Sequence, residues 1–229
     1  EGTKQFLDTL GLWKEIKKYS EPIKKIKIID RSDKNTLDFD NIRRNSNLGY
    51  IVRNSDILKI LYKNLKKNKN INIINNSSIT NIENKLEHVY THTENLIIKS
   101  SLNIAADGKN SFVKKLLKTP SYQKKYNKKA FVITFTHSKH HNNTAYEFFF
   151  NSGPLAVLPM HKEKNNSLSS IVWTNNTDYI ENLMQMNDEK IISILNKKIN
   201  YKLGSLTKIL SKQAFPLSAH LNSKFYENR

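Results

Sequence analysis

The chain has 229 residues, no cysteine and a formal net charge of +18 at pH 7. The lack of cysteine excludes disulfide bonds and thiolate metal sites in this sequence, and it is compatible with a reducing cytoplasm. No apolar run approaches the roughly 20 residues that a transmembrane helix needs, and the length suffices for one or two domains with a sizeable core.

The positive charge comes mostly from lysine, which is mixed with asparagine and isoleucine along the whole sequence. Arginine, which base-reading proteins use for forked contacts, is scarce. We therefore expect no nucleic-acid partner and interpret most of the charge as solvated surface. Binding to an anionic partner, which could be an acidic lipid, a protein or nucleic acid, stays open as the alternative.

The first part of the chain has the pattern of a helix, three strands and a second helix. Apolar side chains recur at helical spacing from Phe6 to Ile16, which predicts an amphipathic helix that Gly11 can distort. Pro22 ends that region. Strands are expected at 23–29, 37–39 and 48–52, and Asn54 or Ser55 is expected to cap the helix that follows.

Short apolar runs continue through the middle of the chain. A buried strand of the parallel type is predicted at 71–74. A meander of three strands is expected next, at 79–82, 86–91 and 96–98. The run 102–106 predicts a further strand.

That last run ends at Asp107-Gly108, and Asn110 or Ser111 then opens an apolar, basic helix. Strand, tight turn and capped helix form the layout in which α/β folds hold a phosphorylated cofactor. Gly108 permits a positive φ and a close backbone approach, and Asp107 offers a carboxylate to hydroxyl groups. Asp-Gly is also a common ordinary turn, so the residues alone leave both interpretations open.

The second half is rich in aromatic and β-branched residues. Strands at 130–136, 145–150, 155–158 and 168–174 are expected to form an antiparallel sheet. Helices are predicted at 178–186 and 188–199, and 209–215 predicts a last strand. The alternation of these pieces with the first half indicates two interleaved domains.

Three histidines, His137, His140 and His141, lie close together in one expected loop. No carboxylate or cysteine accompanies them at ligand spacing, so we expect polar surface and no metal site.

Several short motifs occur in a fixed order along nearly the whole chain. They are Leu10-Gly11-Leu12-Trp13, Pro22-Ile23, Leu48-Gly49-Tyr50-Ile51-Val52, Ala106-Asp107-Gly108-Lys109-Asn110-Ser111, Ala145-Tyr146-Glu147, Gly153 to Pro159, and Ala214-Phe215-Pro216-Leu217-Ser218. Through these motifs the chain resembles the class A flavoprotein monooxygenases, specifically the FAD-dependent hydroxylases of ubiquinone biosynthesis.

The resemblance implies an α/β plus antiparallel β fold, in which a partial Rossmann-like FAD-binding domain is interleaved with an antiparallel-sheet substrate domain. The FAD-binding parts would be 1–22, 52–127 and 216–229, and the substrate-binding parts 23–51 and 128–215. Such enzymes reduce FAD with NAD(P)H and use O₂ to hydroxylate the ring of a polyprenylated phenol.

The resemblance also implies site residues. Asp107 and Gly108 would lie near the FAD ribose and pyrophosphate, in a motif linked to NAD(P)H use. Asn54 would face the flavin side, and the backbone of Ile79 would approach the adenine. The substrate pocket would involve Tyr146, Phe148, Gly153, Pro154, Leu155 and Pro159, with ordinary core packing as the alternative for their side chains. No catalytic residue is assigned.

Some family features are absent from this sequence or altered in it. The family's glycine-rich first motif and its third, Gly-Asp motif do not occur within the 229 residues. Lys114 replaces the usual arginine, and Phe148 stands where an arginine is common. We therefore expect an internal fragment that binds FAD weakly or not at all, from a parent hydroxylase.

The expected location of the parent is the cytoplasm, peripheral to the inner membrane, in a ubiquinone-biosynthesis complex. The alternative function is a non-catalytic basic interaction module, that is, a decayed or split pseudo-enzyme.

Overall fold

The computed structural model describes residues 2–30, 35–40, 46–163 and 166–226. The chain divides into two compact units, each assembled from two separate stretches. Unit 1 comprises Glu1–Asn68 and Tyr126–Leu217, and unit 2 comprises Lys69–Lys125 and Ser218–Arg229. Residues 1–22 and 52–68 thus group with unit 1, and their assignment to an FAD-binding domain stays a prediction.

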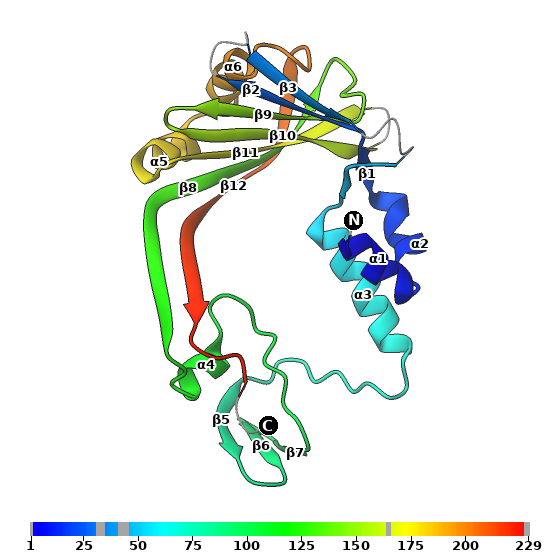
Figure 1. The fold of residues 1–229 in the computed structure, drawn as a ribbon, viewed down its shortest axis with the longest axis vertical. Helices are drawn as coiled ribbons and strands as arrows, with labels where there is room; N and C mark the ends of the chain where they lie inside the picture. Colours follow the sequence, from blue (N-terminus) through cyan, green and yellow to red (C-terminus); the bar gives the residue numbers. More distant parts are fainter. Residues whose placement is uncertain (1, 31–34, 41–45, 164–165, 227–229) are drawn as a thin grey trace. The chain divides into compact units, whose positions relative to one another are not determined.

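Unit 1 is built around a seven-stranded sheet with the order β12-β8-β11-β10-β9-β2-β3 (Figure 1). Strands β8, β11, β10 and β9 pair antiparallel in succession, which confirms the sheet predicted for the second half. At its edge β2 pairs parallel to β9 and antiparallel to β3. The strands are β2 (Lys25–Asp30), β3 (Asn35–Asp40), β8 (Ser121–His137), β9 (Thr144–Phe150), β10 (Gly153–Glu163), β11 (Asn166–Asn176) and β12 (Leu206–Asn222).

Two helices, α5 (Thr177–Gln185) and α6 (Asp188–Lys198), cover one face of this sheet. Burial alternates along the central strands, so that Phe131, Ile133 and Trp173 on the helix-covered face are completely buried. Each such side chain contributes about 2 kcal/mol of hydrophobic stabilisation relative to an exposed one. The alternation of apolar and polar residues that predicted these strands therefore arises because one face of the sheet is buried and the other is partly exposed to solvent.

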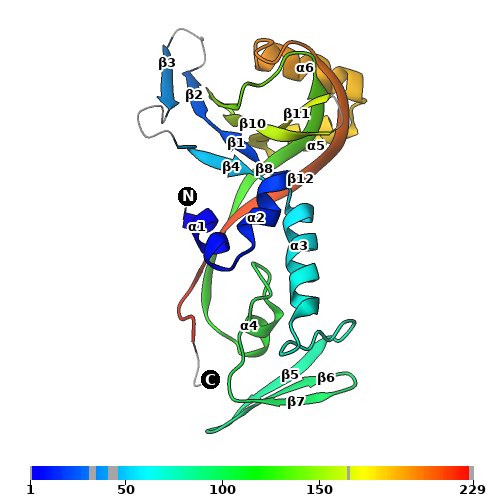
Figure 2. The same ribbon diagram turned by 90° about the vertical axis from the view of Figure 1, so that its right-hand side faces the viewer.

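The remaining elements of unit 1 form a small helical cluster around Trp13, Ile16 and Ile60 (Figure 2). The single helix predicted from Phe6 to Ile16 is split, because Gly11 adopts a φ of 69°. The elements are α1 (Gly2–Thr9), α2 (Trp13–Ile16), the 3₁₀ turn η1 (Lys17–Tyr19), β1 (Glu21–Ile23), β4 (Gly49–Ile51) and α3 (Asn54–Lys67).

The predicted cap of α3 is wrong. Arg53, in an extended conformation, occupies the N-cap position and makes no side-chain capping bond. Asn54 is already the first helical residue, so its side chain lacks the extended backbone that a capping residue needs.

Unit 2 contains the predicted three-stranded meander, and one short helix. The elements are β5 (Ile79–Asn84), β6 (Val89–Thr93), β7 (Ile97–Ser100) and α4 (Phe112–Leu116). None of the helices in the described ranges of either unit is both long and apolar enough to cross a bilayer.

Two predicted strands are wrong. Residues 71–74 and 102–106 form no strand, and Ile71, Ile74, Leu102 and Ile104 are exposed. A buried strand of the parallel type needs neighbours on its edges and faces. Within the described part of the chain no strand pairs with either segment, so these apolar runs remain in irregular structure.

Candidate functional site

The Asp107-Gly108 turn of unit 2 holds the start of α4. Asp107 Oδ2 accepts hydrogen bonds from the backbone N–H groups of Phe112 (2.7 Å) and Val113 (3.1 Å). Ser111 is the N-cap residue, and its hydroxyl accepts a bond from the backbone N–H of Lys114 at 3.0 Å, as predicted. Gly108 has a φ of 79°, which explains the need for glycine there.

These contacts fix the charge state of Asp107. Hydrogen bonding from the Ser111 side chain, and then from the backbone of Val113 and Phe112, lowers the pKa of Asp107 below its usual range. Asp107 is exposed and ionised at neutral pH, and its Oδ2 is used within the chain. Its other oxygen is the one that can meet a hydroxyl group from outside.

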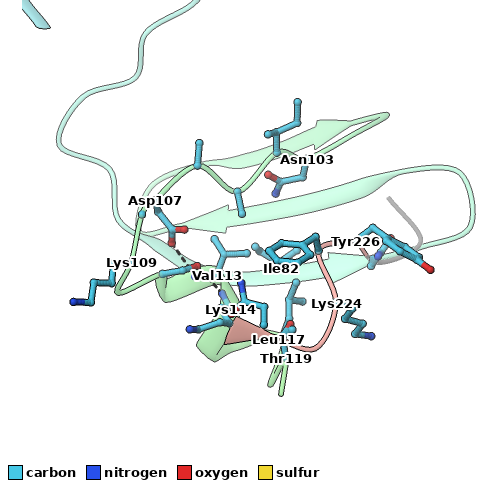
Figure 3. Close-up of a pocket in the computed structure, with 18 of the residues that line it drawn as sticks. Ile82, Asn103, Asp107, Lys109, Val113, Lys114, Leu117, Thr119, Lys224 and Tyr226 are labelled. Carbon is cyan, nitrogen blue, oxygen red and sulfur yellow. Dashed lines mark hydrogen bonds between the residues drawn. The ribbon is translucent and has the colours of Figure 1, made fainter. Parts of the chain in front are cut away.

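A cavity of about 750 Å³ opens beside this turn, entirely within unit 2 (Figure 3). Its volume lies in the usual range for small-molecule and cofactor sites. Apolar side chains such as Ile82, Val113 and Leu117 form part of the wall. The charged and titratable lining residues are Asp107, Lys109, Lys114, His220, Lys224 and Tyr226.

Two polar atoms of the cavity lining are buried without a hydrogen-bond partner among the described residues, namely Asn84 Oδ1 and His220 Nδ1. The other ring nitrogen of His220 lies 3.0 Å from the Ser218 hydroxyl. Burial, followed by the positive charges of Lys109 and Lys114, lowers the pKa of His220. The neutral imidazole therefore has one nitrogen available to a ligand.

This set of groups fits part of a dinucleotide such as FAD. The Asp107 carboxylate and the Asn84 amide oxygen can accept bonds from ribose hydroxyls, and the lysine ammonium groups can neutralise phosphate. Sequence patterns did not indicate Asn84 or His220, because the fold alone brings β5 and the end of β12 to the Asp107 turn.

Asn54 and Ile79 are not at this cavity. Asn54 is exposed at the start of α3 in unit 1. Ile79 begins β5, the strand that contributes Ile82 and Asn84 to the wall, but it does not line the cavity itself. Cofactor contacts at both residues stay predictions.

The aromatic and aliphatic residues predicted for the substrate pocket lie in the core of unit 1. Phe148 and Leu155 are buried beneath α5 and α6. Tyr146 is half-buried against the same core, with its ring centroid 6.3 Å from that of Phe148. Their placement is that of core residues, and a role as pocket wall stays a prediction.

Gly153 and Pro154 begin β10 after a tight turn from β9. Gly153 is buried with a φ of 141°, and a Cβ there would collide with the Thr174 carbonyl oxygen. Pro154 is exposed. The structure thus explains the glycine by backbone packing, and a pocket role for this pair remains untested.

The strand predicted at 155–158 was expected to end before Pro159, and this end is wrong: β10 continues to Glu163. Pro159 pairs with Ser169 of β11, whereas the pairing of β10 with β9 covers only Gly153 to Val157. The missing N–H is therefore tolerated, because β10 has no β9 partner at that position.

The expectation of polar surface is wrong for His137, at the end of β8, and for His141, which are both buried and hydrogen-bonded within the protein. His137 Nδ1 lies 2.8 Å from the Lys139 carbonyl oxygen and its Nε2 lies 3.0 Å from the Ser169 hydroxyl. His141 accepts a bond from the Asn143 N–H and approaches the Met160 carbonyl oxygen at 3.3 Å. We find no cluster of three metal-ligating side chains in the described ranges.

Comparison with known proteins shows similarity along the whole chain. The ubiquinone hydroxylase UbiL of Rhodospirillum rubrum is 24% identical over 226 residues, which cover 98% of this chain and 52% of that protein. The mitochondrial ubiquinone biosynthesis monooxygenase COQ6 of Danio rerio is 26% identical over 209 residues, or 85% of this chain and 42% of that protein. The chain spans about half the length of the curated relatives it matches.

Solved structures share the fold. The flavin-dependent halogenase CmlS superposes with a TM-score of 0.75 at 16% identity, covering 100% of this chain and 44% of the halogenase. The p-nitrophenol 4-monooxygenase PnpA of Pseudomonas putida also gives 0.75, at 13% identity, covering 100% of this chain and 59% of that enzyme. The FAD binding domain family matches residues 1–229. The chain therefore belongs to the FAD binding domain family.

Proposed function

We propose that this chain forms part of an FAD-dependent monooxygenase that hydroxylates a polyprenylated phenol in ubiquinone biosynthesis, with NAD(P)H as reductant. The observation that carries the proposal is the similarity to ubiquinone hydroxylases over 98% of the chain. The family match and the cavity beside Asp107 support the cofactor.

In this proposal the residues of unit 2 bind one part of the cofactor. FAD, when bound, supplies the redox chemistry with O₂. The second carboxylate oxygen of Asp107 accepts a hydrogen bond from a ribose hydroxyl. The ammonium groups of Lys109 and Lys114 neutralise phosphate, and His220 forms a hydrogen bond with a further polar group of the cofactor. Because α4 and the turn already hold the Asp107 side chain in place, little conformational entropy is lost when the cofactor binds.

The test is expression of the full-length gene in a strain that lacks its own ubiquinone hydroxylase. The cells are grown under ¹⁸O₂, and mass spectrometry identifies the products of the quinone pathway. We expect a ring-hydroxylated product that carries one labelled oxygen. Lys114→Ala should lower its amount, because Lys114 lines the cavity. Lys115→Ala, which changes the neighbouring lysine outside the lining, is the matched control. Well-expressed, folded protein without any hydroxylated product would contradict the proposal.

We further propose peripheral association with the inner membrane, because the proposed substrate is hydrophobic and the net charge of +18 favours binding to anionic lipids. Co-sedimentation with phosphatidylglycerol vesicles, but not with phosphatidylcholine vesicles, should decrease as salt is added. Such binding without any hydroxylated product would instead support the non-catalytic basic module.

A further inference from the structure

The seven-stranded sheet has a second face, opposite α5 and α6. We call it the open face. A row of side chains crosses it from β3 to β8, and the strand register places them side by side. The row consists of Leu37, Ile28, Glu147, Ala156, Val172 and Val132. All six are half-buried or exposed, whereas the residues on either side of Val132, Ala156 and Val172 in the sequence are buried.

Glu147 is the one charged residue in this row, near its middle. Its strand neighbours are Ile28 on β2 and Ala156 on β10. Across the described residues, its carboxylate makes no hydrogen bond or ion pair. Burial raises the pKa of Glu147, as expected for a carboxylate on an apolar surface.

Some other carboxylates of unit 1 are paired. Glu15, Glu181 and Asp188 each meet a lysine ammonium group. Glutamate is also a poor strand former, and partial burial of an unpaired carboxylate is unfavourable. Glu147 thus makes no visible contribution to the stability of the fold, and a threonine or valine would suit this position of the sheet better.

The surroundings of Glu147 define what could bind it. A strong acceptor flanked by Ile28, Ala156 and Val172 suits a molecule with one hydroxyl donor on an otherwise apolar body. The strand neighbour Ala156 carries only a methyl group, and the exposed Leu37 extends the apolar surface. A neutral phenol with an apolar substituent has this combination of groups.

We propose that Glu147 is a substrate-binding residue, whose carboxylate accepts a hydrogen bond from the hydroxyl of a phenol lying on the open face. The proposal rests on the proposed hydroxylation of a phenol, which it deepens by naming the residue that orients the ring. Hydrogen bonds to a charged acceptor are stronger than those between neutral groups.

The experiment measures ligand binding to the purified chain at pH 7 by isothermal titration calorimetry. The probes are para-hexylphenol and its methyl ether, para-hexylanisole, which lacks the donor. We expect the wild-type chain to prefer the phenol by about tenfold. Glu147→Leu should abolish the preference, and Glu147→Gln, which keeps a neutral acceptor, should retain only part of it.

The matched control is Glu87→Gln, which removes an exposed carboxylate of unit 2 and should keep the full preference. Equal binding of both probes by the wild type, or no binding, overturns the inference. So does a full preference in the Glu147→Gln chain, a variant that decides the question even if Glu147→Leu does not fold.

The calorimetric measurement of phenol binding requires neither bound flavin nor enzymatic turnover. A Glu147-dependent phenol preference without any hydroxylated product in cells would sink the proposed function and leave the binding assignment standing. Hydroxylated product with no role of Glu147 in phenol binding would do the reverse.

Discussion

At the turn before α4, one carboxylate oxygen of Asp107 receives two backbone N–H groups of the helix. A residue of this kind has a structural role as well as the proposed contact with a ligand. The two roles differ in their dependence on pH and on the cofactor, so they can be separated by measurement.

Asp107→Ala should lower the free energy of unfolding by about 1 kcal/mol at pH 7, the usual cost of losing a helix cap. Because the folded pKa is lowered, the contribution of the charge is present above the ordinary value of 3.8 and is lost as pH falls through the folded pKa. Urea unfolding at pH 7 and pH 3 should therefore show a smaller difference from wild type at pH 3. Asp30→Asn, at an exposed carboxylate of β2, is the control.

Gly153 is required by the backbone at the start of β10. Gly153→Ala should lower the free energy of unfolding by about 3 kcal/mol, through an unfavourable φ and a clash with Thr174. Tryptophan fluorescence during urea unfolding reports the change in unit 1, because Trp13 and Trp173 both lie there. Gly2→Ala, where a Cβ meets nothing within 4 Å, should be harmless. Equal stability of the two variants would contradict this account.

At the scale of elements, the loop after β8 is held by neutral imidazoles. Burial, the largest cause in both cases, lowers the pKa of His137 and His141. Below the ordinary value of 6.5 the unfolded chain binds protons that the folded chain does not. The free energy of unfolding therefore falls as pH drops below 6.5, by at most about 1.4 kcal/mol per pH unit for each histidine.

His137→Asn should reduce this slope between pH 7 and pH 5, although it lowers stability at pH 7 by removing the bond to Ser169. Urea unfolding followed by circular dichroism measures the slope. A slope that is the same in the wild type and in His137→Asn would show that His137 does not titrate as described.

The strands and helices of unit 1 were predictable because their apolar residues alternate with a period that one covered face imposes. The structure of segments 71–74 and 102–106 was not predictable, because a short apolar run indicates burial but does not show which strand, if any, it pairs with. At the candidate site, Asp107 and Gly108 were readable as a turn before a helix. His220 was not, because its role depends on where the far end of β12 lies.

At the scale of the whole molecule, the chain passes between the units after Asn68, after Lys125 and after Leu217. Two of these passages lie inside strands β8 and β12, which are hydrogen-bonded to each other. The first lies in an exposed segment without helix or strand, which joins α3 to β5.

Limited digestion with a lysine-specific protease should therefore cut first after Lys67 or Lys69, because irregular exposed segments are the preferred sites of nicking. Mass spectrometry of the early fragments identifies the site. A chain with both lysines changed to arginine should resist this first cut but otherwise fold alike. Initial cleavage within β8 to β11 would contradict the assignment of the weak point.

Because each unit consists of two separate stretches of the chain, the residues of the two units are completed in a fixed order during synthesis. Every residue of unit 1 has been made before Ser218 leaves the ribosome, so its core can close while unit 2 is still incomplete. The cavity beside Asp107 needs His220 and Lys224, which are translated more than a hundred residues after the turn itself. During that interval the nascent chain contains Asp107 without these two lining residues, so the cavity lining is complete only after the last residue of unit 1 has been translated.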